Sequence, residues 1–188
     1  MKRILLIIVA LLSISVCTYA RQPQKGYRGF IDWTNDVRSM EGFFTRYTIL
    51  YTGLSTSHGY QWNPWLFTGA GLNLEYHHGT GSGIASAFFQ GRTDLKFGKF
   101  TPFGDVRLGY NFSEDGGVYF SPNIGYRFNW GRKVGVNLGV GITLITYKLP
   151  IYEITCEPEA DYTYCDGHYI GKKLWSSVMF SFKVGIDF

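Results

Sequence analysis

The sequence predicts an all-β fold, an eight-stranded antiparallel up-and-down transmembrane β-barrel. Apolar residues recur at every second position through most of the chain, which is the period of a strand and not of a helix. Most of these segments run for about 10 to 15 residues, whereas strands of ordinary globular proteins average about five or six. The face opposite the apolar one carries charges of both signs. Long strands with one apolar and one charged face are typical of barrels that cross a bilayer.

The composition excludes several other classes. The chain has 188 residues, which is enough for one domain with a full core. Aromatic residues make up 18% and charged residues 17% of it, whereas disordered proteins are highly charged and poor in aromatics. A coiled coil is rich in Ala, Glu, Lys and Leu, and this chain instead has 24 glycines. The net charge of +4 is small and scattered, so we expect no nucleic-acid partner.

The N-terminus has the features of a secretory signal peptide over residues 1–20. A basic start at residues 1–3 precedes an almost wholly apolar run over 4–16. Thr18 and Ala20 then place small residues at the −3 and −1 positions of a cleavage site. The apolar run is too short to span a bilayer as a helix. We therefore expect cleavage after Ala20 and export, with residues 21–188 forming one β-barrel domain.

Export makes the cysteines informative. Cys17 would be the lipid-attachment site of a lipoprotein, but Val16 before it is larger than such signals favour. Cleavage removes Cys17 and leaves Cys156 and Cys165 in a polar segment. Because cysteines pair in oxidising compartments, we expect a disulfide between them. The alternatives are two reduced thiols or a metal site, for which His168 alone is weak support.

The first four strands are predicted over residues 26–35, 42–54, 63–76 and 84–97. Their apolar faces carry Tyr27, Ile31 and Trp33; Tyr47, Ile49 and Tyr51; Leu66, Ala70, Leu72, Leu74 and Tyr76; and Ala85, Ala87, Phe89, Leu95 and Phe97. The positions between them are mostly polar or glycine. The alternation is noisier in the first two strands than in the others.

The last four strands are predicted over residues 101–112, 116–129, 133–147 and 172–188. Their apolar faces carry Val106, Leu108, Tyr110 and Phe112; Val118, Phe120, Ile124, Tyr126 and Phe128; Val134, Val136, Leu138, Val140, Ile142 and Leu144; and Val178, Phe180, Phe182, Val184, Ile186 and Phe188. Pro122 lacks an N–H donor and predicts a local irregularity in its strand.

Short connections between most strands predict hairpins, and hence an antiparallel up-and-down order. With both termini at the inner end, the outward loops are expected at 36–41, 77–83, 113–116 and 148–171. The inward turns are expected at 55–62, 98–100 and 130–132. The turn at 55–62 is longer than this topology favours.

Aromatic residues gather at both ends of the predicted strands, as in the interfacial girdles of membrane barrels. One rim would hold Trp33, Phe43, Tyr76, Tyr110 and Tyr147, and the other Trp65, Phe97, Phe103, Phe128 and Trp130. The charges cannot face hydrocarbon, where an arginine at mid-depth costs about 2–4 kcal/mol. We therefore expect a packed lumen of paired charges, in which glycines make room for long side chains. This predicted lumen network comprises Arg28, Asp32, Arg46, Glu75, Arg92, Asp94, Asp105, Arg107, Arg127 and Lys183.

The C-terminus has an aromatic last residue preceded by apolar residues at alternate positions: Phe180, Phe182, Val184, Ile186 and Phe188. This pattern resembles the signature by which the outer-membrane assembly machinery recognises its substrates. With the signal peptide and eight strands, residues 21–188 resemble small OmpA/OmpX-type barrels over their whole length. Short motifs at 26–30, 57–61 and 69–71 are similar to those of small outer-membrane barrels from Bacteroides-type bacteria.

This resemblance implies a bacterial outer-membrane location, with outer-membrane lipids and the assembly machinery as partners. The family includes adhesins, assembly factors and narrow pores, and it has no shared catalytic set. We therefore expect a non-enzymatic barrel with a structural or surface-interaction role, without cofactor or metal.

The predicted loop 148–171 is the candidate interaction surface. It combines a surplus of acidic residues with tyrosines, which offer a large rigid contact area. A partner would be an extracellular or envelope protein. The plainer alternative is a solvated loop held closed by the disulfide. The candidate contact residues are Tyr152, Glu157, Glu159, Asp161, Tyr162, Tyr164 and Tyr169.

Two other functions stay open at the level of sequence. An enzyme acting on lipid A or phospholipid needs a nucleophile, a base and an orienting acid near one membrane surface. The best candidates are Glu75, His77, His78 and Ser82 at one predicted strand end, although adjacent histidines of a strand point to opposite faces. The plainer interpretation is a rim beside a glycine-rich loop. The other function is a narrow pore through the lumen.

Overall fold

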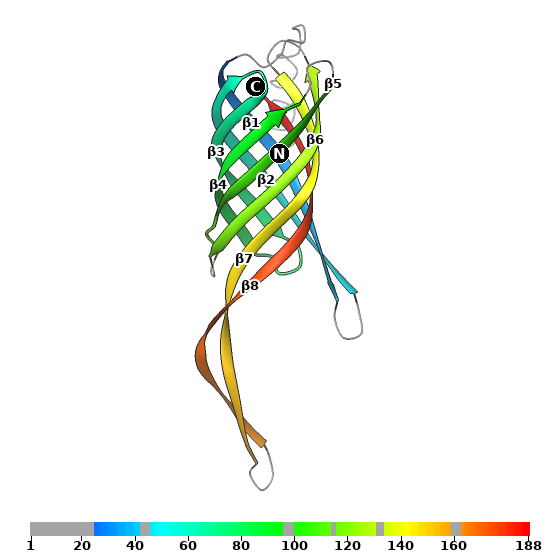
Figure 1. Ribbon diagram of the computed structural model, residues 1–188. Coiled ribbons are helices and arrows are strands. Elements are labelled where there is room, and N and C mark those ends of the chain that lie inside the picture. The colour runs from blue at the N-terminus through cyan, green and yellow to red at the C-terminus, as the bar shows by residue number, and fades with distance from the viewer. Residues whose placement is uncertain (1–24, 42–45, 96–99, 114–115, 131–133, 159–162) are drawn as a thin grey trace, which may run out of the picture.

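The structure is a computed structural model, and it describes residues 25–41, 46–95, 100–113, 116–130, 134–158 and 163–188 (Figure 1). The predicted signal peptide lies outside these ranges. The described residues form eight strands. These are β1 (Gly26–Glu41), β2 (Arg46–Asn63), β3 (Leu66–His77), β4 (Gly83–Asp94), β5 (Phe100–Asn111), β6 (Gly117–Trp130), β7 (Val134–Pro158) and β8 (Thr163–Asp187).

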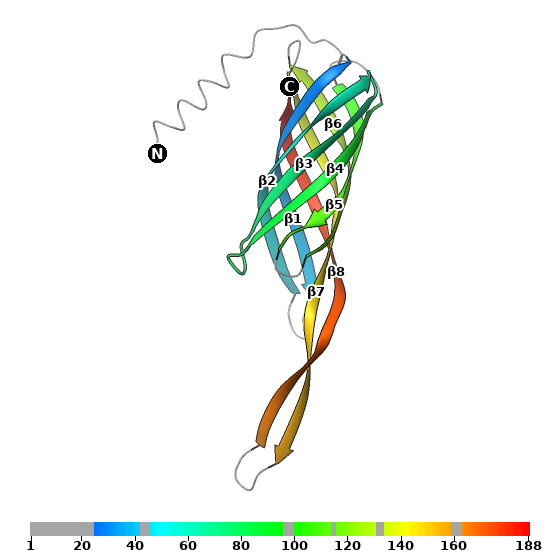
Figure 2. The ribbon, with the colours of Figure 1, turned by 90° about the vertical axis from the view of Figure 1, so that its left-hand side faces the viewer.

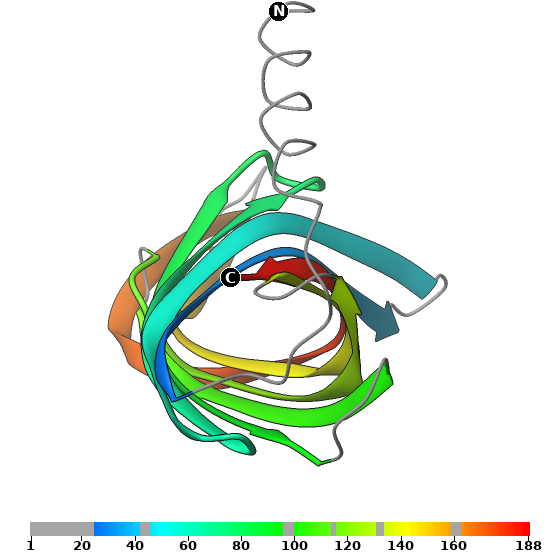
Figure 3. The same cartoon turned by 90° about the horizontal axis from the view of Figure 1, so that it is seen from above.

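The strands close into an antiparallel up-and-down barrel, as the sequence predicts. Each strand pairs with the next one along the chain, and β8 pairs with β1 from Asp187–Phe30 to Phe180–Val37. Closure leaves no unpaired strand edge within the barrel wall. Seen from above, the strands surround one lumen (Figure 3). Within the described residues, no helix is long and apolar enough to cross a bilayer.

The wall of the barrel is apolar outside and polar inside, which is the reverse of a water-soluble protein with an apolar core. Large apolar side chains point outward and are exposed, such as Phe89 at 76%, Ile124 at 68% and Phe180 at 72%. Arginines, aspartates, asparagines and glutamines point inward and are buried. Strand β4 shows this alternation directly, with buried Ser86, Gln90 and Arg92 lying between more exposed neighbours.

Two of the predicted connections near the N-terminus are wrong. Strand β1 continues through the predicted outward loop at 36–41, and the connection to β2 falls at 42–45 instead. The predicted inward turn at 55–62 is part of β2, and the turn lies at 64–65. There, the Asn63 side-chain oxygen accepts hydrogen bonds from the backbone N–H groups of Trp65 at 3.0 Å and Leu66 at 2.8 Å. A side chain that accepts these bonds takes the place of a strand partner and stabilises a tight turn. The connection between β2 and β3 is therefore shorter than the turn expected at 55–62.

Two aromatic residues face the opposite side from the one predicted. Tyr51, assigned to the apolar outer face of its strand, points inward and is buried. Phe103, assigned to an aromatic rim, also points into the lumen and is buried. In β2 the exposed residues are Leu50 and Leu54, so the outer face of this strand carries the even-numbered positions.

The predicted loop 148–171 is mostly a two-stranded hairpin. Beyond the last pair with β6, Tyr119–Ile145, strand β7 pairs only with β8, from Thr146–Ser176 to Pro158–Thr163. At about 3.3 Å per residue this projection, which we call the long hairpin, reaches roughly 40 Å past the wall. Figures 1 and 2 show it leaving one end of the barrel, hereafter the hairpin end, opposite the terminal end where β1 begins and β8 ends. A register shift between Ile151 and Tyr152 marks a bulge, which adds twist.

Glycine is required at one inward position of β8. A Cβ atom at Gly185 would overlap the Asp32 carboxylate and lie 2.7 Å from the Ile31 carbonyl oxygen. We expect Gly185→Val to lower the free energy of unfolding by about 1–3 kcal/mol, the range for overpacking. Urea titration of the refolded protein in detergent micelles measures it. The matched control is Gly91→Val, because a Cβ at Gly91 meets nothing within 4 Å. Equal stability of the two variants would contradict this account.

Candidate functional site

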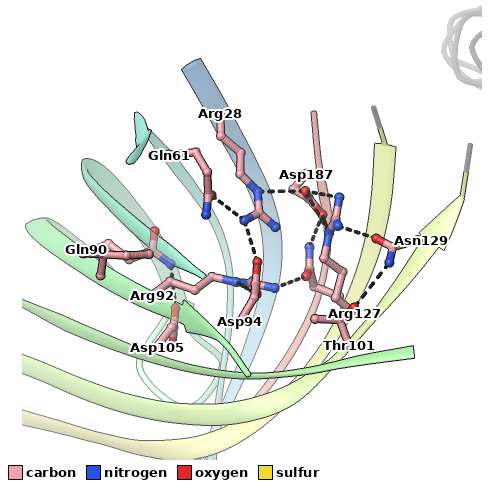
Figure 4. Close-up of polar contacts among 12 residues, drawn as sticks. Arg28, Gln61, Gln90, Arg92, Asp94, Thr101, Asp105, Arg127, Asn129 and Asp187 are labelled. Atoms are coloured by element: carbon pink, nitrogen blue, oxygen red, sulfur yellow. Dashed lines mark hydrogen bonds and ion pairs between the residues drawn. The ribbon is translucent and has the colours of Figure 1, made fainter. Parts of the chain in front are cut away.

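The terminal end of the lumen is held by a carboxylate that contacts two arginines and an amide. Asp187 accepts from Arg28 Nε at 3.0 Å and pairs with Arg127 Nη2 at 2.8 Å. It also accepts from Asn137 Nδ2 at 3.0 Å. Figure 4 shows these side chains converging from different strands. Their convergence ties β1, β6, β7 and β8 together through one buried residue.

The same network continues across the lumen to β2 and β4. Arg28 Nη1 donates to Gln61 Oε1 at 2.8 Å and to Asp94 Oδ2 at 2.9 Å. Asp94 also accepts from Arg92 Nε at 3.1 Å, and Arg92 Nη2 donates to Asn137 Oδ1 at 2.7 Å (Figure 4). Each charge of this network therefore meets an opposite charge or an amide, which is what makes buried ions tolerable.

Inward aromatic rings fill the space between these charges. The Arg92 guanidinium carbon lies 3.6 Å from the centre of the Phe103 ring, and that of Arg28 lies 4.7 Å from the Phe30 ring. Phe30 packs edge-on against Phe67, with ring centres 4.9 Å apart. Cation–π attraction explains why apolar rings share a face with arginines. Alternation places Phe30, Phe67 and Phe103 on the inward face of their strands, but it does not predict their contacts with the arginines.

A second charged layer lies deeper in the lumen. Arg107 pairs with Asp32 and, at 3.3 Å, with Asp105. Its Nη1 donates to Ser55 Oγ at 2.8 Å. Asp105 also accepts from Gln90 Nε2 at 2.6 Å.

Nine of the ten residues in the predicted lumen network have described side chains, and all nine are buried inside the barrel: Arg28, Asp32, Glu75, Arg92, Asp94, Asp105, Arg107, Arg127 and Lys183. The tenth, Arg46, lies where β2 pairs only with β1, opposite Glu41, and its side chain lies outside the described residues. The sequence prediction missed Asp36 and Asp187. Asp36 falls in the predicted loop 36–41. In the structure it continues the alternation of inward-facing residues along β1, two positions after buried Thr34.

Asp36 and Glu75 form the least satisfied part of the lumen. Both are buried, and among the described residues Asp36 has no hydrogen-bond partner for either carboxylate oxygen. Glu75 Oε1 accepts from Asn73 Nδ2 at 2.6 Å, whereas its Oε2 has no described partner. Lys183 donates to Ser121 Oγ at 3.1 Å. It lies on β8 two positions after Ser181, which is opposite Asp36 in the strand pairing.

An apolar layer separates these charges from the hairpin end. It consists of Tyr51, Phe88, Tyr119, Ile145 and Met179, all buried and packed together. We call this cluster the plug. It is built from inward positions on five strands.

Above the plug, the hairpin end of the lumen opens into a cavity of about 670 Å³. Tyr51, Ile145 and Met179 of the plug form its apolar floor. Its polar lining consists of Arg38, His77, Thr80, Ser82, Asn111, Ser113, Tyr147 and Ser177. We call this space the outer cavity. Its size is within the range of pockets that hold small organic molecules.

The structure joins two of the predicted catalytic candidates, His77 and Ser82, through the Thr80 hydroxyl, which contacts both His77 Nδ1 and Ser82 Oγ. Among the described residues, Glu75 and His78 have no hydrogen bond to this chain. His77 Nδ1 accepts from the Thr80 backbone N–H at 3.0 Å, and among the described residues its contacts do not include Glu75. Ser82 Oγ contacts Thr80 Oγ1 at 2.6 Å. His78 is exposed and lies within 3.1 Å of Thr52 Oγ1. The two histidines thus face opposite sides of the wall, as strand alternation predicts.

The predicted interaction residues lie along the long hairpin. Tyr152 and Tyr169 are exposed and pack edge-on, with ring centres 5.9 Å apart. Glu157 and Tyr164 are opposite each other in the strand pairing, but their side chains lie outside the described residues. Glu159, Asp161 and Tyr162 lie wholly outside them. The hairpin also carries a cation–aromatic contact, with Lys173 Nζ 5.7 Å from the Trp175 ring centre.

The register of the long hairpin places Cys156 directly opposite Cys165. A disulfide between them stays a prediction. We expect exported protein to resist alkylation at both positions until it is reduced, as intact mass before and after reductant will report. Cys156→Ser is expected to leave Cys165 open to the reagent. Alkylation of both cysteines without reductant would contradict the pairing.

The residues of the predicted assembly signature share the outer face of β8. Phe180, Phe182, Val184 and Phe188 are exposed, and Ile186 is partly so.

Among the described residues, no group of three or more His, Cys, Asp and Glu side chains is arranged to hold a metal ion. The chain matches no known protein-family model and no curated protein. The functional conclusion therefore rests on the fold and on the apolar outer and polar inner faces of its wall.

Proposed function

We propose that the protein is a non-enzymatic integral barrel of the bacterial outer membrane, with a role in envelope structure or surface interaction. The observation that carries this proposal is the reversal of the two faces of the wall. Phe89, Ile124 and Phe180 are among a band of apolar side chains exposed around the barrel. Water-soluble monomers rarely expose continuous apolar patches above a few hundred Å². A surrounding bilayer removes this surface from water.

The lumen supports a structural role over conduction. Among the described residues, the buried charged side chains are five cations and six carboxylates, so the charges nearly balance. Most of them are held in direct pairs such as Arg28–Asp94 and Arg107–Asp105. Selective pores instead present rings of one charge to the permeating ion. The plug adds an apolar layer across the same path.

The long hairpin supports surface interaction. Beyond Thr146 and Ser176 each strand has one partner only, so the outer edges of both strands offer backbone N–H and C=O groups. Such edges recruit an extended segment of another protein by strand addition. Exposed Tyr152, Tyr169 and Ile170 provide side-chain contacts beside these edges. The partner class is an extracellular or envelope protein.

The proposal includes export through cleavage after Ala20 and recognition by the assembly machinery through the outward residues of β8. The long hairpin would then project away from the cell, because the termini of such barrels lie in the periplasm.

Heat modifiability tests the proposal. Folded protein in mild detergent is expected to migrate faster on a gel than the same sample after boiling. The refolded protein is also expected to float with lipid vesicles in a density gradient. Protein that stays in the aqueous fraction, with one mobility before and after boiling, would contradict a membrane barrel.

A further inference from the structure

Two residues that line the outer cavity have buried polar atoms without a described hydrogen-bond partner. His77 is 8% exposed and Ser177 is 5% exposed, and both line the cavity. Among the described residues, neither His77 Nε2 nor Ser177 Oγ has a hydrogen-bond partner. Burying such groups without partners costs free energy, so a ligand that satisfies them is favoured.

The chemistry of His77 decides which kind of ligand this is. Its Nδ1 accepts the Thr80 backbone N–H at 3.0 Å, so in the neutral ring the proton resides on Nε2. Tyr51 packs against the ring, with centres 4.6 Å apart, and holds its orientation. The unpartnered Nε2–H is therefore a buried donor in the wall of the cavity. It requires an acceptor atom on the ligand.

The charged lining of the cavity also favours a ligand with acceptor atoms. Arg38 is the charged residue among its described lining, which includes no aspartate or glutamate. Its two terminal nitrogens lie 3.5 Å from Tyr147 Oη, a distance at the weak limit of hydrogen bonding. Arg38 also forms a side-chain hydrogen bond with Tyr51, so its described contacts are both to neutral hydroxyl groups. A guanidinium with neutral contacts is suited to pair with an oxyanion.

We propose that the outer cavity is a binding site for a small organic oxyanion, a carboxylate or phosphate ester carried on a compact ring. Arg38, His77 Nε2 and Ser177 Oγ hold the anionic end, and the apolar floor of Tyr51, Ile145 and Met179 supports the ring. The volume of about 670 Å³ accommodates a molecule of monosaccharide to disaccharide size. This site is distinct from the long hairpin and does not depend on its partner.

Titration of the folded protein in detergent micelles tests the site. The readout is the imidazole nitrogen resonance of His77 in protein labelled with ¹⁵N-histidine, assigned with His77→Gln. The probes are glucuronate, glucose 6-phosphate, neutral glucose and inorganic phosphate. We expect at least one of the two acids to shift the His77 signal saturably, and to bind about tenfold or more tightly than glucose. His78 serves as the internal control, because it faces the outside of the wall and its signal is expected to stay in place.

Two variants separate this site from general charge attraction. Arg38→Gln is expected to weaken binding about tenfold or more. The control is Lys148→Gln, which removes an exposed cation of the hairpin outside the cavity and is expected to leave binding unchanged. Ser177→Ala removes a hydroxyl that has no described partner, so it should weaken binding while the heat-dependent gel shift is retained. The proposal is overturned if neither acid binds saturably, or if glucose or inorganic phosphate binds as tightly as the acids. Equal weakening by Arg38→Gln and Lys148→Gln would also overturn it.

Discussion

Replacing Asp187 with asparagine is expected to destabilise the folded barrel by about 3–5 kcal/mol, the cost of breaking a buried ion pair from one side. The substitution keeps the shape of the side chain but removes the charge that faces Arg28 and Arg127. Both cations would stay buried at the terminal end of the lumen, and Arg127 would lose its described carboxylate partner. Equilibrium urea unfolding of the protein refolded into lipid vesicles measures the change.

Refolding from urea separates this effect from biogenesis, because Asp187 lies within the C-terminal strand that is proposed to be recognised during assembly. The control is Glu153→Gln, which removes a carboxylate from the exposed surface of the long hairpin. Exposed charges contribute at most about 1 kcal/mol. If Asp187→Asn changed stability as little as Glu153→Gln, the lumen network would not be a main source of the stability of the barrel.

Replacing Ile124 with arginine is expected to cost about 2–4 kcal/mol when the protein is folded in a bilayer. Ile124 lies near the middle of β6 on the outer face, where 68% of its side chain is exposed. Lipid surrounds this position in the proposed membrane barrel, so a cation there loses its hydration. In a water-soluble barrel the same change would expose a charge to solvent and cost almost nothing.

The matched control for this variant is Ile170→Arg. Ile170 is 56% exposed but lies on the long hairpin, beyond the wall. We expect its substitution to change the free energy of unfolding by less than about 0.5 kcal/mol, as for other exposed positions. Similar small effects at Ile124 and Ile170 would argue that the outer face of the barrel is in contact with water.

The parts of the fold that follow a strict two-residue period could be predicted from sequence. In β8, Phe180 and Phe182 alternate with Ser181 and Lys183, and the structure places them on opposite faces as expected. The same regularity identified nearly all of the buried lumen charges. The up-and-down order and the closure of the barrel followed from the even number of strands and the short connections, because neighbouring antiparallel strands need only a tight turn.

The features that sequence could not place depend on contacts across the barrel. Tyr51 faces inward within the plug, and both faces of its strand carry apolar residues, so alternation alone does not place it. The alternation of β5 puts Phe103 on the face opposite Val106 and Leu108, but its contact with Arg92 comes from the neighbouring strand. The sequence predicts a loop where the long hairpin lies, because its outward positions are polar as well as apolar. A two-stranded ribbon with both faces exposed has no need of alternation. The outer cavity joins Arg38, His77 and Ser177 from three strands, a proximity set by register alone.

The central claim is that lipid surrounds the outer face of the wall while water surrounds the long hairpin. Spin labels at Ile124→Cys and Ile170→Cys, each in a Cys156→Ser, Cys165→Ser background, test it most directly in lipid vesicles. We predict that the label at 124 collides with molecular oxygen and is shielded from a water-soluble nickel chelate, with the reverse at 170. Equal access of the nickel chelate to both labels would contradict the membrane barrel.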